Sequence, residues 1–254
     1  MNMQKRIWIV VAFLVSWSVR ADEVNISAAA SLKECLNEII EAYGKKMPNT
    51  RIVPNYEASG KLQKQIENGA PVDLFISANQ DKMDAVEKKA LIKKGSRINL
   101  LENKVVLIVP VAKPRVIDSF AALGSDKLKA NGLAIGDPKV VPAGAYALDV
   151  LAFFKITDQV LPKVVYAQNV RAVLAYVAQG EVDAGIVYLT DALAMKERVK
   201  IIATAPEGSH QPTIYPAAVV TTGANAAGGE AFLSFLKGDE AAPIFITYGF
   251  TKAR

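Results

Sequence analysis

The sequence has few of the side chains that enzymes use as nucleophiles, bases or metal ligands. It contains one cysteine, Cys35, and one histidine, His210, among 254 residues. A single cysteine excludes an intramolecular disulfide, and Cys35 shares a predicted helical face with Leu32 and Ile39, which favours a buried thiol. No Ser–His or Cys–His pairing and no cage of histidine, cysteine and carboxylate ligands is apparent. The composition therefore argues against nucleophilic catalysis and against a resident metal centre.

Long apolar runs are missing as well. Lys5 and Arg6 precede an apolar run over 7–15, and small residues stand at the cleavage positions within 19–21. This pattern predicts that residues 1–21 form a secretory signal peptide, cleaved after Ala21. The run is too short to cross a membrane, and no later segment has 18 uninterrupted apolar residues. With no cysteine at the cleavage site, we expect a soluble, unlipidated mature chain in a bacterial periplasm.

The charge balance gives no indication of a nucleic-acid partner. The full chain has a formal net charge of +5, from 30 basic and 25 acidic residues. The predicted signal peptide carries three of the basic residues and none of the acidic ones, so the mature chain is left with about +2. Such a small, evenly spread excess does not predict nucleic-acid binding.

Predicted strands and helices alternate along most of the mature chain, which favours an α/β fold with parallel sheets covered on both faces. In such folds ligands bind beyond the carboxyl ends of the strands. The predicted strands cover 24–27, 51–53, 73–78, 105–109, 133–135, 164–167, 185–188, 201–203 and 217–220.

Ser31 is the first candidate binding residue. It follows the strand over 24–27, opens a helix, and precedes Glu34 by three residues, which is the spacing of a capping box. Serine is a favoured N-cap in any protein, so Ser31 can simply cap its helix. The same junction also directs free N–H groups and a hydroxyl at one point, which suits an anion. One junction alone does not decide between these roles.

Other strand ends repeat this arrangement. Three of them also coincide with the start of a helix, and one presents a phenol. These candidates are Ser59, Ala143, Val170 and Tyr188. Together with Ser31 they offer two hydroxyls, one phenol and several helix-start N–H groups.

A set of neutral donors suits an anion that must be held and later released. A fully deprotonated tetrahedral dianion satisfies every donor, whereas a protonated phosphate would bring its own O–H to a site without an acceptor. The nearby carboxylates do not change this interpretation, because Asp137 fits a turn and Asp191 fits a helix cap.

Several motifs, taken together and in this order, resemble the periplasmic molybdate-binding protein (ModA) family of ABC transporters over nearly the whole mature chain. They are AAASL at 28–32, ASGKL at 58–62, GAPVDLFISA at 69–78, GDPKVVPAGAYA at 136–147, NVRAVLAYV at 169–177, GIVYLTDA at 185–192, YPAAVV at 215–220 and EAAPIFITYGF at 240–250. The run around Ser59 departs from the family, where relatives often have a serine-rich stretch.

The resemblance implies a two-lobed type II periplasmic binding protein fold with a ligand cleft between the lobes. One lobe would comprise 22–103 plus 222–254 and the other 104–221, with hinge crossings near 103–104 and 221–222. It also implies that the lobes close over one oxyanion.

The resemblance further assigns the ligand set. Molybdate, and equally tungstate, would be held through its oxygens, with no direct coordination of the metal and no cofactor. The implied ligand residues are Ser31, Ser59, Ala143, Val170 and Tyr188.

Neighbouring residues receive other roles. Tyr146 is expected to pack on a helix face, and Arg171 to make a surface or hinge contact rather than bind the ligand. The implied partner is the membrane permease of a molybdate ABC transporter, and the binding protein itself is expected to be a monomer.

Three other functions are compatible with part of this sequence. The same fold could bind another oxyanion, such as sulfate, or a small organic anion, because pocket size is not readable from a sequence. An enzyme would need a base or nucleophile in the cleft. A cytosolic ligand-sensing domain of a transcription regulator shares the fold, but the predicted signal peptide and the lack of a DNA-binding segment count against it.

Overall fold

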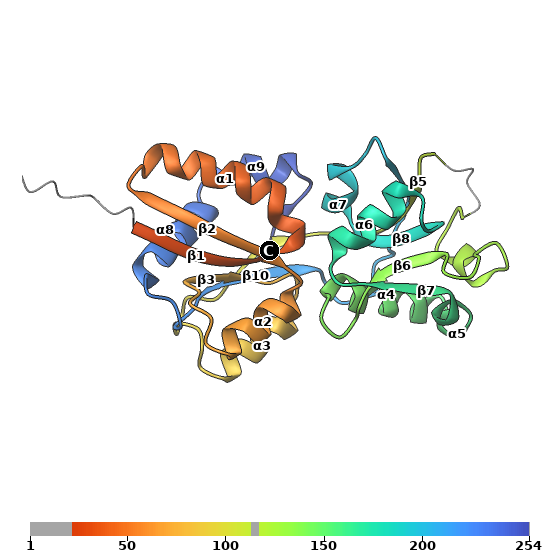
Figure 1. The fold of residues 1–254 in the computed structure, drawn as a ribbon, viewed down its shortest axis with the longest axis horizontal. Coiled ribbons are helices and arrows are strands. Elements are labelled where there is room, and N and C mark those ends of the chain that lie inside the picture. Colours follow the sequence, from red (N-terminus) through yellow and green to blue (C-terminus); the bar gives the residue numbers. More distant parts are fainter. Residues whose placement is uncertain (1–21, 113–116, 254) are drawn as a thin grey trace, which may run out of the picture.

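The chain folds into two lobes, each built on one sheet (Figure 1). The computed structural model describes residues 22–112 and 117–253, so the predicted signal peptide lies outside the described residues. The first sheet has the strand order β11-β4-β10-β3-β1-β2 and the second has the order β7-β6-β8-β5-β9.

The first sheet contains strands from both ends of the described chain. Its members, in sheet order, are β11 (Thr251–Lys252), β4 (Ile98–Glu102), β10 (Ile214–Val219), β3 (Leu74–Ile76), β1 (Asp22–Ala29) and β2 (Thr50–Glu57). Helices α1 and α9 lie on one side of this sheet and α2 and α3 on the other (Figure 1). The helices of this lobe are α1 (Lys33–Lys46), α2 (Ser59–Glu67), α3 (Gln80–Lys88), α8 (Ala226–Lys237) and α9 (Ala241–Thr247).

The second sheet is formed by the middle of the chain. Its strands are β7 (Val164–Ala167), β6 (Leu133–Gly136), β8 (Ala184–Tyr188), β5 (Val105–Pro110) and β9 (Val199–Thr204). Its helices are α4 (Pro142–Phe153), α5 (Thr157–Val160), α6 (Val170–Gln179) and α7 (Leu189–Ala194). Short 3-10 turns complete the fold: η1 (Ala30–Leu32), η2 (Ala121–Gly124) and η3 (Leu161–Lys163).

Both faces of the first sheet are buried, as the continuous apolar strands predict. In β3, Leu74 and Ile76 belong to the larger apolar core, whereas Phe75 points to the opposite face. There Phe75 joins Leu62 of α2 and Met83 of α3 in a separate cluster. Strand β1, which pairs with β3 and β2, ends at the edge of this sheet that faces the second lobe (Figure 1).

The sheets are mixed rather than parallel throughout. Strand β1 pairs in parallel with β2 and β3, and β6 pairs in parallel with β7 and β8. Strand β10 is antiparallel to β3 and β4, and β5 is antiparallel to β8 and β9. The parallel pairs are the ones that carry the candidate residues at their carboxyl ends.

The predicted lobe boundary at 221–222 does not match the pairing of β10. This strand lies within the predicted second lobe, 104–221, but pairs with β3 and β4 of the first sheet. The chain therefore returns to the first lobe before Ile214, between the end of β9 and the start of β10. Asn103-Lys104 lies between β4 of the first sheet and β5 of the second, and the Asn103 N–H donates to the Thr213 carbonyl at 3.0 Å. The two crossings thus run side by side.

Candidate functional site

All five candidate residues line one small cavity between the lobes. None has a side chain more than 4% exposed. The cavity volume is about 10 Å³, which leaves no room for an extended organic molecule in this arrangement. Its lining consists of Ala29, Ala30, Ser31, Glu57, Ala58, Ser59, Ala78, Val141, Pro142, Ala143, Val170 and Tyr188.

Three of the candidates lie in the first turn of a helix. Ser59 and Val170 are the first residues of α2 and α6, and Ala143 follows Pro142 at the start of α4. The N–H groups of a first helical turn have no acceptor within their own helix. They therefore supply donors, and the positive ends of three helix dipoles, to the same small cavity.

Ser31 does not form the predicted capping box. It lies in the 3-10 turn η1, while α1 begins at Lys33, and neither cap position has a side-chain hydrogen bond. The Ser31 hydroxyl is instead hydrogen-bonded to the Tyr215 phenol, 2.8 Å away and also buried. Glu34 forms an ion pair with Arg171. The Ser31 hydroxyl and the Glu34 carboxylate, which the local pattern predicts to cap the helix together, thus each have a partner from a distant segment instead.

The Ser59 hydroxyl is oriented by a backbone donor. The Ala78 N–H donates to Ser59 Oγ at 2.9 Å, within a buried environment. Since the hydroxyl oxygen already accepts this bond, the Ser59 O–H is left to donate elsewhere. Ser59 lines the cavity, so an anion in the cavity is the acceptor that this proton suits.

Tyr188 brings a hydroxyl that has no partner in the described part of the chain. The residue is 2% exposed, and its phenol oxygen is buried without a hydrogen bond. Burial, followed by the neighbouring phenol of Tyr215, raises the pKa of Tyr188 well above its ordinary value. Tyr188 therefore stays a neutral donor at physiological pH. An unpaired buried hydroxyl is costly, and a bound anion would satisfy it.

Glu57 also lines the cavity, which the sequence did not predict. Its Oε1 accepts from the Ala58 N–H at 2.8 Å and from Asn169 Nδ2 at 3.0 Å, and Lys61 pairs with Oε2 at 3.2 Å. Burial alone would raise the pKa of Glu57, but these hydrogen bonds outweigh it and lower the pKa. The carboxylate is thus occupied by its own donors. Asn169 joins it from the second lobe and also caps α6 by accepting from the Ala172 N–H.

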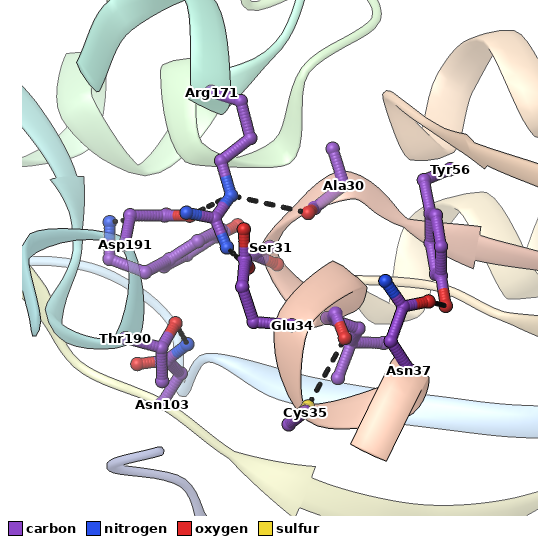
Figure 2. A network of polar contacts seen from close by, with 12 residues as sticks. Ala30, Ser31, Glu34, Cys35, Asn37, Tyr56, Asn103, Arg171, Thr190 and Asp191 are labelled. Carbon is purple, nitrogen blue, oxygen red and sulfur yellow. Dashed lines mark hydrogen bonds and ion pairs between the residues drawn. The ribbon is translucent and has the colours of Figure 1, made fainter. Parts of the chain in front are cut away.

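Arg171 lies between the two lobes (Figure 2). Its Nε donates to the Ala30 carbonyl at 3.3 Å and lies 3.1 Å from Asp191 Oδ1, while its Nη2 pairs with Glu34. Arg171 was expected to make a surface or hinge contact; it instead bridges the two lobes across the cleft, and its side chain is only 19% exposed. Arg171 does not line the cavity, and two carboxylates compensate its charge.

Asp191 is a buried carboxyl beside Arg171. Burial raises its pKa to about 6, although the Arg171 charge and the hydrogen bond from the Tyr188 N–H act in the opposite direction. That N–H donates to Asp191 Oδ2 at 3.2 Å, so Asp191 caps α7 as predicted. It thereby fixes the backbone of Tyr188 at the cavity.

Further contacts across the cleft show that the lobes are closed. The Gly60 N–H donates to the Val140 carbonyl at 2.9 Å, and Lys82 Nζ reaches the Lys139 carbonyl at 3.2 Å. A Cβ on Gly60 would lie 2.6 Å from that Val140 oxygen, so no larger residue fits here without moving the two lobes apart.

The remaining predicted residues have structural partners. Tyr146 packs against Tyr188 and does not line the cavity, and Asp137 accepts from the Lys139 N–H at 3.0 Å in a turn. The Cys35 thiol is buried and donates to the Leu32 carbonyl at 3.2 Å. Within 22–112 and 117–253, no group of three or more histidine, cysteine or acidic side chains could hold a metal ion. Nor is any helix in these ranges long and apolar enough to span a bilayer.

The fold and the cavity define a class of protein: a two-lobed binding protein that closes over one small anion. Residues 24–251 match the family model described as bacterial extracellular solute-binding protein. The chain is 44% identical over 247 residues to the molybdate-binding protein ModA of Escherichia coli, covering 95% of this chain and 94% of that one. It is 40% identical over 228 residues to a putative ABC transporter substrate-binding lipoprotein of Bacillus subtilis, covering 90% and 86%.

Solved structures give the same result. The periplasmic molybdate-binding protein of Azotobacter vinelandii superposes with a TM-score of 0.80 at 25% identity, covering 91% of this chain and all of that one. A sulfate-binding protein from Mycobacterium tuberculosis, at 18% identity and a TM-score of 0.77 over 91% and 87%, shares the fold. The chain belongs to the ModA family of extracellular solute-binding proteins. Its family is one of binding proteins rather than enzymes.

Proposed function

We propose that this protein captures molybdate, and equally tungstate, between its lobes and delivers the ion to the permease of an ABC transporter. One observation carries the proposal. Five donor-bearing residues from both lobes, identified from the sequence, line one buried cavity. The names of the relatives in Escherichia coli and Azotobacter vinelandii agree with this ligand.

The donors explain how a dianion can be held without a bound cation. Ser31, Ser59 and Tyr188 offer O–H groups, and the helix starts at Ala143 and Val170 offer N–H groups. Each charge-assisted hydrogen bond contributes roughly 1.5–3 kcal/mol, so several together offset the dehydration of the anion. The metal is reached only through its oxygens, and no cofactor is required.

Closure explains capture and release. The ligands come from both lobes, so the ion is fully enclosed only when the lobes meet. Reopening about the paired crossings at Asn103 and Thr213 would release it to the permease. In this account the protein acts as a monomer in the periplasm, after removal of residues 1–21.

Calorimetric titration of purified residues 22–254 with molybdate, tungstate, sulfate and phosphate tests the proposal. We expect molybdate and tungstate to bind with similar affinity, and sulfate and phosphate to bind much more weakly. Sulfate or phosphate binding as tightly as molybdate would contradict the assignment and favour a receptor for another oxyanion.

A further inference from the structure

Ser31 is connected through Tyr215 to Asn103, which lies at the first crossing between the lobes. Ser31 Oγ and Tyr215 Oη are 2.8 Å apart, and Asn103 Nδ2 lies 3.2 Å from the same Tyr215 oxygen. Asn103 Nδ2 also donates to Thr190 Oγ1 of the second lobe, at 2.9 Å (Figure 2). A chain of hydrogen bonds thus runs from the crossing to the cavity.

The direction of this chain is set at Asn103. The Lys104 N–H donates to Asn103 Oδ1 at 2.8 Å, so the amide oxygen faces the backbone. The amide nitrogen must then face Tyr215 and Thr190, and it can only donate. Tyr215 Oη therefore accepts from Asn103.

The proton of Tyr215 consequently has one acceptor within hydrogen-bond distance in the described chain, Ser31 Oγ at 2.8 Å. Tyr215 is fully buried, and burial, followed by the charge of Asp191, raises its pKa well above the ordinary value, so the phenol keeps its proton. The Tyr188 ring lies 5.7 Å away, centroid to centroid, but its hydroxyl is not within hydrogen-bond geometry of any protein group in the described residues. If Ser31 donated to Tyr215 instead, the phenol proton would be left buried and unpaired, which is costly. The contacts around Tyr215 thus favour donation from its phenol to Ser31.

We propose that Asn103 and Tyr215 are positioning residues that make Ser31 an obligate hydrogen-bond donor to the bound anion and thereby select against protonated oxyanions. This inference rests on the proposed function, because it assigns a cause to the anion selectivity of that site. Ser31 Oγ accepts from Tyr215, so its own proton is directed to the cavity. An anion that carries an O–H then meets the Ser31 proton where it would need a lone pair, and it loses that hydrogen bond.

Tyr215→Phe removes the donor that fixes Ser31 and keeps the ring that packs against Phe250. Loss of one such hydrogen bond corresponds to about a tenfold weaker affinity for molybdate. Sulfate, which carries no proton at pH 7, should lose the same factor. Phosphate carries at least one O–H at pH 7 and should lose less, because Ser31 can now accept from it. Tyr248→Phe, which removes a surface phenol that donates to Glu38 at 2.9 Å, is the matched control.

Asn103→Asp tests the direction of the chain. The new carboxylate accepts from Tyr215, so Tyr215 must accept from Ser31, and the Ser31 proton turns away from the cavity. We expect a larger loss of molybdate affinity than for Tyr215→Phe. The same change made in the Tyr215→Phe background controls for the added negative charge. Without the phenol, the reversed hydrogen-bond direction cannot pass from the new carboxylate to Ser31, so only the effect of the charge remains. The effect of Asn103→Asp should therefore be smaller in that background.

The proposal would be overturned if Tyr215→Phe reduced the affinities for molybdate, sulfate and phosphate equally, or not at all. It would also be overturned if Asn103→Asp reduced molybdate affinity equally in the wild-type and Tyr215→Phe backgrounds. NMR of the ligand-free protein gives an independent readout. The slowly exchanging Tyr215 hydroxyl proton should show a cross-peak to the Ser31 β-protons that disappears in Asn103→Asp. If the wild-type protein bound none of the four oxyanions, the proposed function would fail, and this cross-peak would still decide the hydrogen-bond direction.

Discussion

Tyr188 has a buried hydroxyl without a hydrogen bond. The two serines of the cavity differ from it, because Ser31 is hydrogen-bonded to Tyr215 and Ser59 accepts from the Ala78 N–H. An unsatisfied buried hydroxyl destabilises the protein by roughly 1–3 kcal/mol. Such a cost is acceptable where the group serves a ligand, since strained or unpaired groups concentrate at functional sites. Tyr188 is therefore the residue at which stability and binding should change in opposite directions.

Tyr188→Phe removes this hydroxyl and leaves the ring in place. We expect the free energy of unfolding of the ligand-free protein to rise by about 1 kcal/mol, because an unpaired polar atom is removed. Molybdate affinity should fall by about tenfold or more, because one donor to the anion is lost. Urea denaturation and calorimetry on the same samples measure both quantities. A variant that lost stability and kept full affinity would show that Tyr188 is only a packing residue.

Asp191 gives a prediction about pH. Its folded-state pKa of about 6 lies above the ordinary value of 3.8, so the native protein holds a proton that the unfolded chain has already released between these pH values. Its contribution to stability is complete below about pH 3.8 and is lost as the pH rises through about 6. The loss amounts to roughly 3 kcal/mol at most.

Replacing the carboxyl isolates this effect. The free energy of unfolding of the wild type, minus that of Asp191→Asn, should fall as the pH rises from 4 to 7 in urea titrations. Asp158→Asn, at an exposed position on α5, is the surface control. A difference that stayed constant, or that increased with pH, would contradict the assignment of the raised pKa to Asp191.

The candidate binding residues could be predicted because each occupies a locally recognisable position, at a strand end or a helix start. The residues that orient them could not. Tyr215 is 184 positions from Ser31, and Asn169 is 112 positions from Glu57, so no local pattern links them. The capping box failed for the same reason, since the pairing of Glu34 with Arg171 spans 137 positions.

At the scale of elements, α2 carries the closest approach between the lobes. Its Gly60 N–H donates to Val140, and the glycine lacks the Cβ that would clash with the same carbonyl. Gly60 therefore has a role in closure that is separate from the stability of α2, in which alanine would normally be the better residue.

Gly60→Ala should separate these two roles. We expect molybdate affinity to fall by tenfold or more, because the new methyl holds the lobes apart, while the free energy of unfolding without ligand stays the same or rises. Gly44→Ala in α1 is the matched control, because nothing lies within 4 Å of its added Cβ. Calorimetry and urea denaturation measure the two effects. Identical affinities for both variants would argue against the closed contact at Gly60.

The prediction of elements was good where apolar runs were long and weak where they were short. The strands at the ends of which the candidates lie were all anticipated. Strands β4 and β11 were not predicted, because β4 is half-polar and β11, which pairs only with β4 at the edge of the first sheet, is two exposed residues long. The direction of β10 was missed as well, and with it the second lobe boundary, because strand direction depends on chain crossings that have no local signature.

On the scale of the whole molecule, the lobes enclose a cavity to which each contributes donors. Contacts between charged or polar groups surround it: Arg171 with Glu34 and Asn169 with Glu57. The resemblance predicted the two lobes and the cleft between them, whereas the network of contacts that closes the cleft required the structure.

The central claim is that one oxyanion binds at this cavity through groups of both lobes. Anomalous diffraction at the molybdenum absorption edge, from crystals of residues 22–254 grown with molybdate, tests it directly. We predict one strong peak between the lobes, with its oxygens within hydrogen-bond distance of the hydroxyls of Ser31, Ser59 and Tyr188 and the N–H groups of Ala143 and Val170. A peak outside this cavity, such as in the surface groove lined by Phe153, Thr204 and His210, or direct coordination of molybdenum by a side chain, would contradict this claim.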